Sequence, residues 1–339
     1  MKIWFDILTP KQILFFDPMI KQLRKNNPIL CTTRNYREVN ELSKLKKMKL
    51  TVVGKHGGTT KPGKLDASLK RCISLGAIIE RFKPDLTISF CSPEASRVAF
   101  GLGIRHVAFC DSPHAEAVMK LSIPFVDKLL IPWIIPKKEF TRYGIAQKDI
   151  IPYKAIDAAI IVKNAIRTKI RKDKEKTILI RVEEEQAAYV QKNNHTIQMI
   201  QKISNNLPQY KISVLPRYRS QIVKLKKTLE NRVQILNKTM IGSELLQNVD
   251  VFVGSGGTMT AESALIGIPT ISYNAAPNLV QDYLVRKKLV VLESNPDKII
   301  LQIEKFLSSD NKSLQKNAQK TLASMEDPYK KLIQTIRKQ

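Results

Sequence analysis

The residues best suited to chemistry lie between Val249 and Tyr273, where an apolar run is followed by Gly-Ser-Gly-Gly and a second apolar stripe. Glycines have no Cβ, so the backbone can turn sharply there and a ligand can approach it closely. Hydroxyl residues around the turn can cap a helix, whose unpaired N–H groups and dipole favour an anion. A tight turn without a ligand would show the same pattern. The pattern predicts a strand, a phosphate-binding turn and a helix, with these binding residues: Gly254, Ser255, Gly256, Gly257 and Thr258.

Glu262 lies one turn into the predicted helix and faces the same end of the strand. Its carboxylate would repel a phosphate, but it is a good acceptor for hydroxyl groups such as those of a ribose. The turn and the carboxylate together indicate a ligand that combines a diphosphate with a sugar.

Two arginines follow other strands predicted in the same half of the chain. Arg181 closes the run Thr-Ile-Leu-Ile-Arg, and Arg217 follows Ser-Val-Leu-Pro. Both are expected at the sheet edge that carries the glycine turn, where a guanidinium fork suits diphosphate oxygens. Each could instead be solvated or paired with the acidic run Glu183–Glu185.

The first half of the chain offers several candidates for proton transfer. His56 stands in a glycine-containing segment after a predicted strand, and an imidazole near its usual pKa can act as a general base. An ordinary loop histidine would look the same. The segment Leu8–Gln12 is expected to line a cleft, and Asp6 is expected inside the first strand rather than at its tip.

A third cluster follows two further strands, at Cys91–Arg97 and Cys110–Ala117. Carboxylates and a histidine at neighbouring strand ends suit proton transfer or recognition of sugar hydroxyls. The Asp-Ser-Pro run could instead be only a helix cap followed by a proline. The cysteines lack a neighbouring base and are expected to be buried and unreactive. The candidates for chemistry in this cluster are Glu94, Asp111, His114 and Glu116.

Short apolar runs alternate with amphipathic stretches along the chain, which predicts parallel βαβ units. The strands expected in the first half are Lys2–Ile7, Ile29–Thr32, Thr51–Val53, Leu86–Phe90, His106–Phe109 and Lys128–Ile131. The helices expected between them are Phe15–Lys25, Arg37–Lys46, Leu65–Arg81 and Ala95–Gly101.

A second series begins after the basic segment Asn164–Lys176. Its expected strands are Thr177–Arg181, Lys211–Leu215, Val233–Ile235, Val249–Gly254, Thr270–Tyr273 and Leu289–Val291. Its expected helices are Asn194–Asn205, Gln221–Asn231, Ser243–Gln247, Thr258–Ile266 and Asn278–Lys287. The prediction is therefore an α/β protein with two doubly wound, Rossmann-like domains, at 1–164 and 165–310, and a helical end at 311–339 that could cross back to the first domain.

The chain of 339 residues carries 57 Lys and Arg against 30 Asp and Glu, a net charge of +27. Such a field attracts polyanions, but no recognition motif for nucleic acid accompanies it, so nucleic acid is not expected. The charge suits either a lysine-rich solvated surface or contact with an anionic membrane. No apolar run reaches the ~18 residues of a membrane span, and the scattered cysteines suggest reduced thiols. We expect a cytoplasmic protein, with peripheral contact at the inner face of the membrane as an alternative.

Taken in order, the opening segment Lys2–Ile20, Gly-Lys-His-Gly-Gly, Phe-Cys-Asp-Ser-Pro-His-Ala, Leu-Pro-Arg-Tyr-Arg-Ser-Gln and the glycine turn resemble the family known as domain of unknown function 354. That family is similar to GT-B glycosyltransferases and to the non-hydrolysing UDP-N-acetylglucosamine 2-epimerase. In the transferase that makes lipid II, a glutamate five residues before the glycine of Gly-x-Pro holds the ribose. Glu262 precedes Gly267 by five, so the resemblance implies that role for it.

The resemblance also has gaps. The transferase has a glycine-rich loop with a histidine after its first strand, where this chain has Thr-Pro-Lys-Gln. The epimerase has a His-x-Glu-Ala segment, which His114–Ala117 resembles, and a Gly-Asp-Thr where this chain has Cys91–Pro93. The missing aspartate argues against epimerase activity.

The resemblance implies a metal-independent glycosyltransferase that takes a nucleotide-sugar, with UDP as the expected nucleotide, and an acceptor that could be lipid-linked. No metal and no tightly bound cofactor are expected. The alternatives are an epimerase or hydrolase of the same ligand, and a non-catalytic binder of anions or nucleic acid. The expected base is one of four residues: His56, Asp111, His114 and Glu116.

Overall fold

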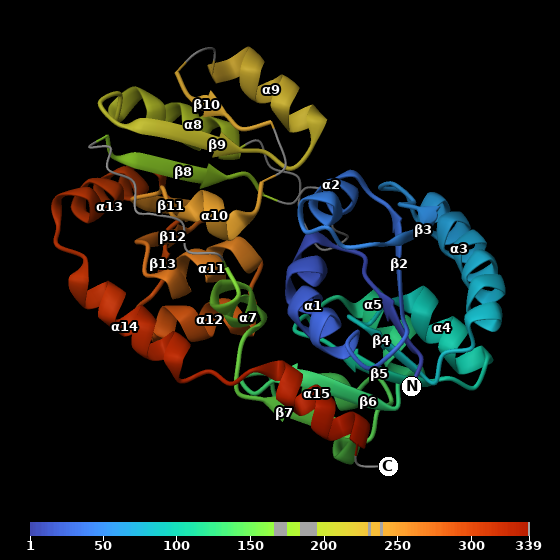
Figure 1. The fold of residues 1–339 in the computed structure, drawn as a ribbon. Coiled ribbons are helices and arrows are strands. Elements are labelled where there is room, and N and C mark those ends of the chain that lie inside the picture. The colour runs from blue at the N-terminus through green and yellow to red at the C-terminus, as the bar shows by residue number, and fades with distance from the viewer. Residues whose placement is uncertain (166–174, 184–194, 230–231, 238–239, 338–339) are drawn as a thin grey trace. The chain divides into compact units, whose positions relative to one another are not determined.

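The computed structural model describes residues 1–165, 175–183, 195–229, 232–237 and 240–337. The chain divides into two compact units, Met1–Ile160 with Glu326–Gln339, and Ile161–Met325 (Figure 1). Each unit is a parallel sheet with helices between its strands, so the expected doubly wound α/β fold is confirmed. Residues 166–174 of the expected connecting segment lie outside the described residues, as do the expected helix ends Asn194 and Asn231.

The first unit contains a sheet in the order β3-β2-β1-β4-β5-β6-β7, with every pairing parallel. Sequence order breaks between β1 and β4, so the carboxyl ends of these two strands flank the crevice where α/β sheets bind ligands. The strands are β1 (Ile3–Asp6), β2 (Ile29–Asn35), β3 (Thr51–Lys55), β4 (Leu86–Ser89), β5 (Arg105–Phe109), β6 (Lys128–Pro132) and β7 (Ile150–Tyr153).

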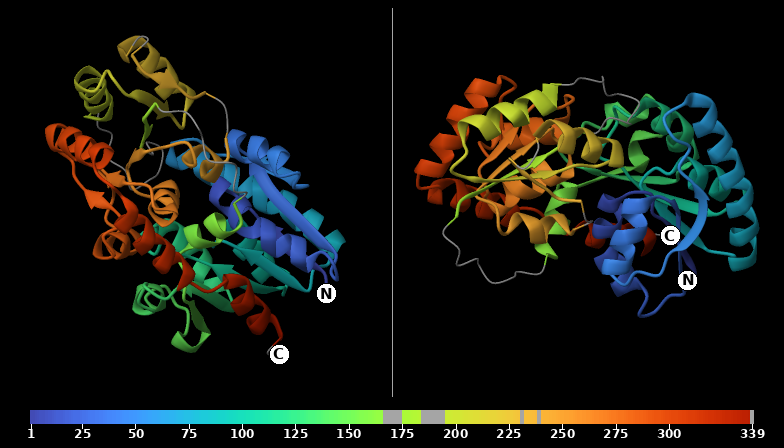
Figure 2. Two further views of the ribbon diagram at one scale, coloured as in Figure 1. Left: turned by 60° about the vertical axis from the view of Figure 1, so that its left-hand side comes forward. Right: turned by 90° about the horizontal axis from the view of Figure 1, so that it is seen from above.

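Helices cover both faces of this sheet, as right-handed crossovers require. α1 packs against α2, while α3 lies beside β3 and packs against α4, which in turn contacts α5 (Figures 1 and 2). The last helix of the chain, α15, contacts β6 and β7. The bounds are α1 (Pro10–Leu23), α2 (Arg37–Leu45), α3 (Lys61–Phe82), α4 (Pro93–Gly101), α5 (Glu116–Ser122), α6 (Lys138–Thr141), α7 (Asp157–Lys163) and α15 (Pro328–Arg337).

Capping residues decide where the helices at the crevice begin. Thr9 precedes a proline, and its hydroxyl oxygen accepts from the backbone N–H of Gln12, so α1 begins at Pro10, five residues before the predicted start. Ser92 plays the same part for α4, with Pro93 as the first helical residue. These caps bring the first turns of both helices close to the ends of β1 and β4.

The second unit repeats the pattern in the order β10-β9-β8-β11-β12-β13, again with parallel pairings. Its order breaks between β8 and β11. The strands are β8 (Thr177–Arg181), β9 (Lys211–Leu215), β10 (Gln234–Ile235), β11 (Val251–Gly254), β12 (Thr270–Ser272) and β13 (Val291–Leu292). The helices are α8 (His195–Asn206), α9 (Arg219–Leu229), α10 (Gly242–Leu246), α11 (Thr258–Ile266), α12 (Leu279–Arg286), α13 (Pro296–Ser308) and α14 (Lys312–Ala323).

Some expected elements differ from those observed. The predicted elements do not include β7 or the helices α5, α6, α7 and α13. β7 carries Pro152, which weakens a strand signal but is tolerated on an edge strand. The predicted first strand runs to Ile7, whereas β1 ends at Asp6. The expectation that Asp6 lies inside the strand is therefore wrong: Asp6 is the last residue of β1, and its side chain is fully buried at the strand tip.

Candidate functional site

The glycine turn joins β11 to α11 at the order break of the second sheet, and α11 begins at Thr258 as predicted. Two of its glycines are required by the protein's own packing. A Cβ on Gly254 would stand 2.6 Å from Phe252 Cε1, and one on Gly256, where φ is +79°, would stand 2.9 Å from Ala275 Cβ. Gly257, with φ +82°, has nothing within 4 Å of its Cβ position. The backbone at Gly257 is therefore the part of the turn that a ligand could approach.

Ser255 and Thr258 flank these glycines and are partly exposed. Gly257 is the residue that precedes the first turn of α11, and its carbonyl accepts from the N–H of Ala261 at 3.2 Å. The start of a nine-residue helix presents N–H groups and the positive end of its dipole, which suits an anion.

Glu262 lies in the middle of α11 and is 3% exposed. Among the described residues, its Oε2 atom has no hydrogen-bond partner. Burial raises the pKa of this carboxyl to about 8. The oxygen faces Gly242 at the start of α10, where a Cβ would stand 3.3 Å from it. A buried carboxyl oxygen with unused hydrogen-bonding capacity is a site for a hydroxyl donor.

Arg181 and Arg217 lie at the carboxyl ends of β8 and β9, the strands on the other side of the same order break. Arg181 Nη1 donates to the carbonyl of Pro216 at 3.0 Å, and Arg217 Nε donates to the carbonyl of Val182 at 3.3 Å. The Tyr273 hydroxyl donates to the carbonyl of Arg181 at 3.2 Å. These bonds to backbone oxygens hold both arginines at the predicted sheet edge.

The sequence left open that the acidic run Glu183–Glu185 pairs with these arginines, and only Glu183 of that run lies among the described residues. The Glu183 carboxylate accepts from the hydroxyl of Thr196, and Glu184 and Glu185 lie outside the described residues.

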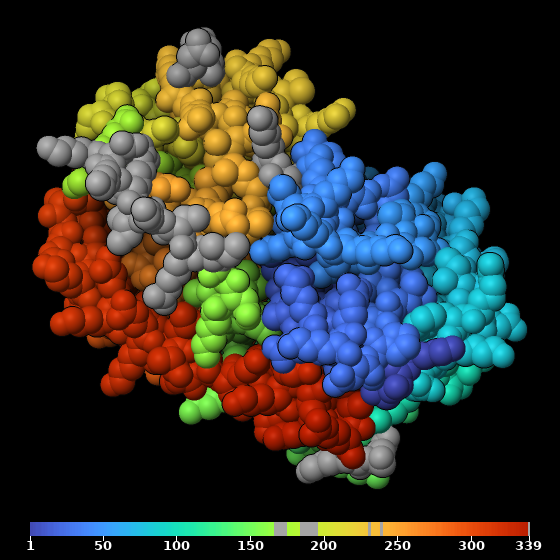
Figure 3. Space-filling view, viewed as in Figure 1, coloured from blue at the N-terminus to red at the C-terminus, as the bar shows by residue number. Residues whose placement is uncertain are grey.

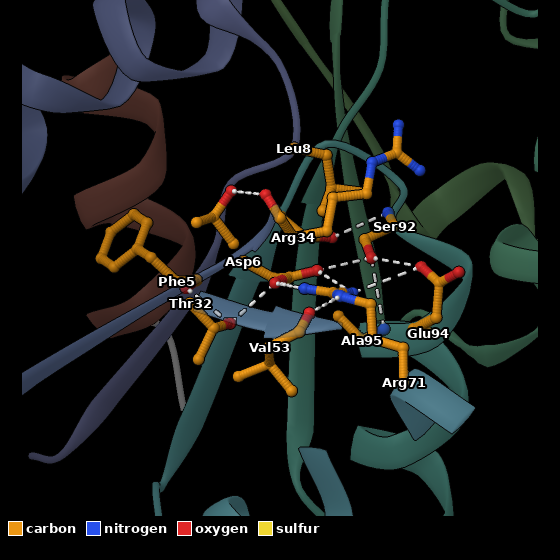
Figure 4. A network of polar contacts seen from close by, with 12 residues as sticks. Phe5, Asp6, Leu8, Thr32, Arg34, Val53, Arg71, Ser92, Glu94 and Ala95 are labelled. Atoms are coloured by element: carbon orange, nitrogen blue, oxygen red, sulfur yellow. Dashed lines mark hydrogen bonds and ion pairs between the residues drawn. The ribbon is translucent and has the colours of Figure 1, made fainter. Parts of the chain in front are cut away.

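A buried ionic network occupies the corresponding position of the first unit, between the ends of β1 and β4 (Figure 4). Arg71 of α3 lies between two carboxylates, with Nη2 2.5 Å from Asp6 Oδ1 and Nη1 3.4 Å from Glu94 Oε2. The hydroxyls of Ser92 and Thr32 donate to Asp6 at 2.6 and 2.7 Å. Burial favours the neutral acid, but Arg71 and these donors hold the pKa of Asp6 below its usual value. Asp6 is thus a fixed anion and is unsuited to carrying protons.

A second cluster stands further along the same edge. Lys11 Nζ lies 2.8 Å from Asp111 Oδ1 and 3.0 Å from Asp157 Oδ2, and the Tyr153 hydroxyl donates to Asp157 at 2.6 Å. Lys11 also lies over the ring of Phe90, 4.5 Å from its centroid. This cluster joins α1 to the ends of β5 and β7.

The two aspartates of this cluster have very different proton affinities. Although burial opposes ionisation, Lys11 lowers the pKa of Asp111 to about 2. Burial and the neighbouring Asp111 charge raise the pKa of Asp157 to about 7. Near neutral pH Asp111 is therefore ionised, whereas Asp157 is about half protonated.

The other predicted bases occupy different settings. His114 is exposed by its overall surface area, but its imidazole is partly desolvated, which lowers its pKa. The charge of the nearby Asp111 carboxylate acts in the opposite direction. The Glu116 carboxylate is exposed on α5 and lies 2.6 Å from Lys120 Nζ. His56 stacks on Tyr36 with centroids 5.6 Å apart, and its Nδ1 accepts from the N–H of Gly58 at 3.1 Å. Asp111 and His114 are thus neighbours, whereas Glu94 belongs to the Arg71 network.

Sequence reasoning did not assign roles to Lys11, Arg71 and Asp157. Lys11 stands in a segment expected to line a cleft, directly after a Thr-Pro helix start. Asp157 follows β7, the strand that the prediction lacks. Arg71 is 65 residues from Asp6 in the chain, and no local pattern signals that pairing. Within the described ranges, no group of three or more His, Cys, Asp or Glu side chains is arranged to hold a metal ion.

Two doubly wound parallel sheets in one chain define the GT-B-like class of proteins, which includes glycosyltransferases and UDP-GlcNAc 2-epimerases. The chain belongs to the family described as Protein of unknown function (DUF354), whose model matches residues 1–339. The resemblance seen in the sequence motifs is therefore confirmed.

Known proteins similar to the chain cover nearly its whole length. The uncharacterized protein MJ0665 of Methanocaldococcus jannaschii is 27% identical over 317 residues, which are 89% of this chain and 90% of that protein. The UDP-GlcNAc 2-epimerase of Neisseria meningitidis bound to UDP-GlcNAc has a TM-score of 0.78 at 16% identity, with 100% of both chains covered. The spinosyn rhamnosyltransferase SpnG, complexed with spinosyn aglycone, has a TM-score of 0.64 at 11% identity, with 99% of this chain and 100% of that chain covered. At these identities the two structures establish the fold.

Proposed function

We propose that the protein binds a nucleotide-sugar, with UDP as the expected nucleotide, and transfers the sugar to an acceptor. The observation that carries this proposal is the unpartnered, buried Oε2 of Glu262 one helical turn after an anion-compatible glycine turn. A ribose hydroxyl that donates to Glu262 would supply the missing hydrogen bond, while the diphosphate would meet the start of α11. The fold shared with a UDP-GlcNAc-bound epimerase supports this choice of ligand.

Cleavage of the bond between sugar and diphosphate develops negative charge on the leaving group. Fixed N–H groups at the start of α11 and the guanidiniums of Arg181 and Arg217 are suited to stabilise that charge. Hydrogen bonds from the two arginine side chains to backbone carbonyls hold the guanidiniums in place before the ligand binds. The side chains therefore need little rearrangement on binding. This arrangement supplies the positive charge from the protein itself.

For the proton of the acceptor hydroxyl we propose His114, with Asp111 as the group that stabilises the resulting imidazolium. The lowered pKa of His114 keeps its ring neutral near pH 7, so it can accept a proton, and the Asp111 charge favours the protonated product. His56 is less suited, because its Nδ1 already accepts a hydrogen bond. Glu116 is paired with Lys120, and its side chain is 64% exposed. The turnover of His114→Gln should lose the wild-type fall in rate at low pH, whereas an unchanged pH profile would exclude His114 as the base.

Epimerisation of the same ligand is the second candidate, because several structures with the same fold are UDP-GlcNAc 2-epimerases and because Asp157, beside the ionised Asp111, is about half protonated near neutral pH. Against it, Cys91–Pro93 lacks the aspartate of the epimerase motif, and Asp6 is fixed by Arg71. Product analysis separates the two reactions, since an epimer forms without an acceptor.

Cytoplasmic location, a lipid-linked acceptor and contact with an anionic membrane belong to the same proposal. Among the described residues, no helix is both long and apolar enough to cross a bilayer. A non-catalytic binder of nucleic acid is the remaining alternative, and it requires retention on DNA or RNA that weakens steeply with salt.

The deciding experiment is a thermal-shift panel of nucleotides and nucleotide-sugars. At 100 times the dissociation constant, a ligand adds about 2.7 kcal/mol of stability. We expect a shift for one nucleotide family, its loss in Glu262→Ala, and its retention in Glu304→Ala, which changes an exposed glutamate of the same unit. A full shift in Glu262→Ala would remove Glu262 from the site.

A further inference from the structure

The outer face of α3 carries a row of exposed apolar side chains. Leu65, Leu69 and Ile73 are 62%, 57% and 77% exposed, and they follow one another at intervals of four residues. Residues at this spacing lie on one face of a helix. In Figure 3 the residues of α3, coloured light blue to cyan, lie on the surface of the first unit. We call Leu65, Leu69 and Ile73 the α3 ridge.

The α3 ridge is not explained by the packing of its own unit. The inner face of the helix is already occupied, since Leu75 and Ile79 belong to a core cluster with Trp4 and Val53. Single exposed leucines are common on protein surfaces, but a row over two helical turns on the solvent side is the reverse of an ordinary amphipathic surface helix. Such a row marks a surface that another body covers.

Basic residues border the α3 ridge. Lys61 and Lys64 stand in the first turn of α3, and Lys70 lies on the far side of the ridge, 2.8 Å from Asp66. The whole chain carries a net charge of +27. An apolar stripe bordered by lysines is the chemistry of helices that lie in the interface of an anionic membrane.

We propose that α3 is a membrane-contact helix, which places Leu65, Leu69 and Ile73 in the interface of an anionic lipid surface and its lysines against the headgroups. This contact stands independently of the sugar chemistry. A second step rests on the proposed function. The chain passes from the carboxyl end of β3 at Lys55 to the start of α3 at Lys61, on the sheet edge that carries Asp111, so a lipid-linked acceptor would be presented to that edge.

Charge favours a lipid surface over a second copy of the chain. In a symmetric pairing of two ridges, the lysines that border one ridge would lie near those of the other. Two molecules of charge +27 also repel each other. An anionic surface removes both costs.

The experiment measures co-sedimentation of the whole protein with phosphatidylcholine vesicles, with and without phosphatidylglycerol. We expect binding to the anionic vesicles that weakens with salt. A triple variant, Leu65→Gln, Leu69→Gln and Ile73→Gln, should bind at least about tenfold more weakly. Lys61→Gln with Lys64→Gln should weaken binding at low salt, by roughly fivefold for each lysine.

The matched control is Leu301→Gln, which changes a leucine that is 65% exposed on α13 in the other unit. It should bind as the wild type does. Because all four positions are exposed, we expect the variants to fold, and far-ultraviolet circular dichroism checks this. Equal vesicle binding by the triple variant and the wild type would overturn the proposal. A second result would also overturn it: the wild type is a dimer, the triple variant is a monomer, and both bind vesicles equally. The ridge would then pair two copies of the chain. Nucleotide-induced thermal shifts of the triple variant report on the sugar site separately.

Discussion

Replacing Glu262 by glutamine should change how the stability of the protein depends on pH. The unfolded carboxyl loses its proton near its ordinary pKa of 4.5, whereas the buried carboxyl keeps it up to about 8. Between these values the folded state binds more protons than the unfolded state, so stability falls as pH rises. At about 1.36 kcal/mol for each unit of pKa, the whole fall approaches about 5 kcal/mol. Glutamine does not titrate, so Glu262→Gln should lack this fall.

Urea unfolding of wild type and Glu262→Gln at pH 5 and pH 8 measures the effect. The informative quantity is the difference between the two pH values, because any cost of burying the glutamine amide is present at both. We expect the variant to gain a few kcal/mol relative to wild type on going from pH 5 to pH 8. Glu304→Gln, at an exposed position, should follow the wild type. A parallel response of wild type and Glu262→Gln would refute the description of Glu262 as a buried neutral acid.

The raised pKa of Glu262 also predicts that ligand binding is coupled to the release of a proton. Hydroxyl donors stabilise the ionised carboxylate, so nucleotide binding should lower the pKa of Glu262 and release a proton between pH 4.5 and 8. Calorimetric titrations in two buffers of different ionisation enthalpy detect that proton, and its absence would separate Glu262 from the bound ligand.

Three further predictions concern stability. Arg71→Met should cost about 3–5 kcal/mol in urea unfolding, because it leaves Asp6 buried without its cation, whereas Arg81→Met on the exposed part of α3 should cost little. Burial lowers the pKa of His106 to about 3, so the wild type should lose stability as pH falls from about 6.5, when the unfolded imidazole gains a proton; His106→Gln should show a shallower loss, and an unchanged loss would contradict this assignment. Gly256→Ala should cost about 1–3 kcal/mol, since φ is +79° and its Cβ would stand 2.9 Å from Ala275, and an unaltered unfolding midpoint would contradict that geometry.

The fold could be predicted from the sequence because its signals are local. Apolar runs and turn residues identify most of the strands, and the glycines before Thr258 determine the start of α11. Strand order, by contrast, depends on contacts between distant segments. β7 escaped prediction because Pro152 interrupts its pattern, and the loss of that strand also hid the position of Asp157.

The candidate site divides in the same way. The glycine turn and the two arginines are recognised by residue type at strand ends, and Glu262 is recognised by its place one turn into the helix that follows. The Asp6–Arg71 and Lys11–Asp157 pairs join residues 65 and 146 positions apart, and only the folded chain brings them together. The role of Asp6 as a fixed anion could not be predicted, because it depends on the distant Arg71.

The way the chain returns to its first unit affects how the protein is made. The second unit is an insertion between Ile160 and Glu326, and the N–H of Glu326 donates to the carbonyl of Lys154 at 2.9 Å where the chain re-enters. α15, whose carbonyl at Thr335 accepts from Arg105 at 2.9 Å, therefore leaves the ribosome after the whole second unit. During synthesis the second unit can complete its sheet while the first still lacks its last helix. A premature stop before α15 would thus damage the unit that was synthesised first.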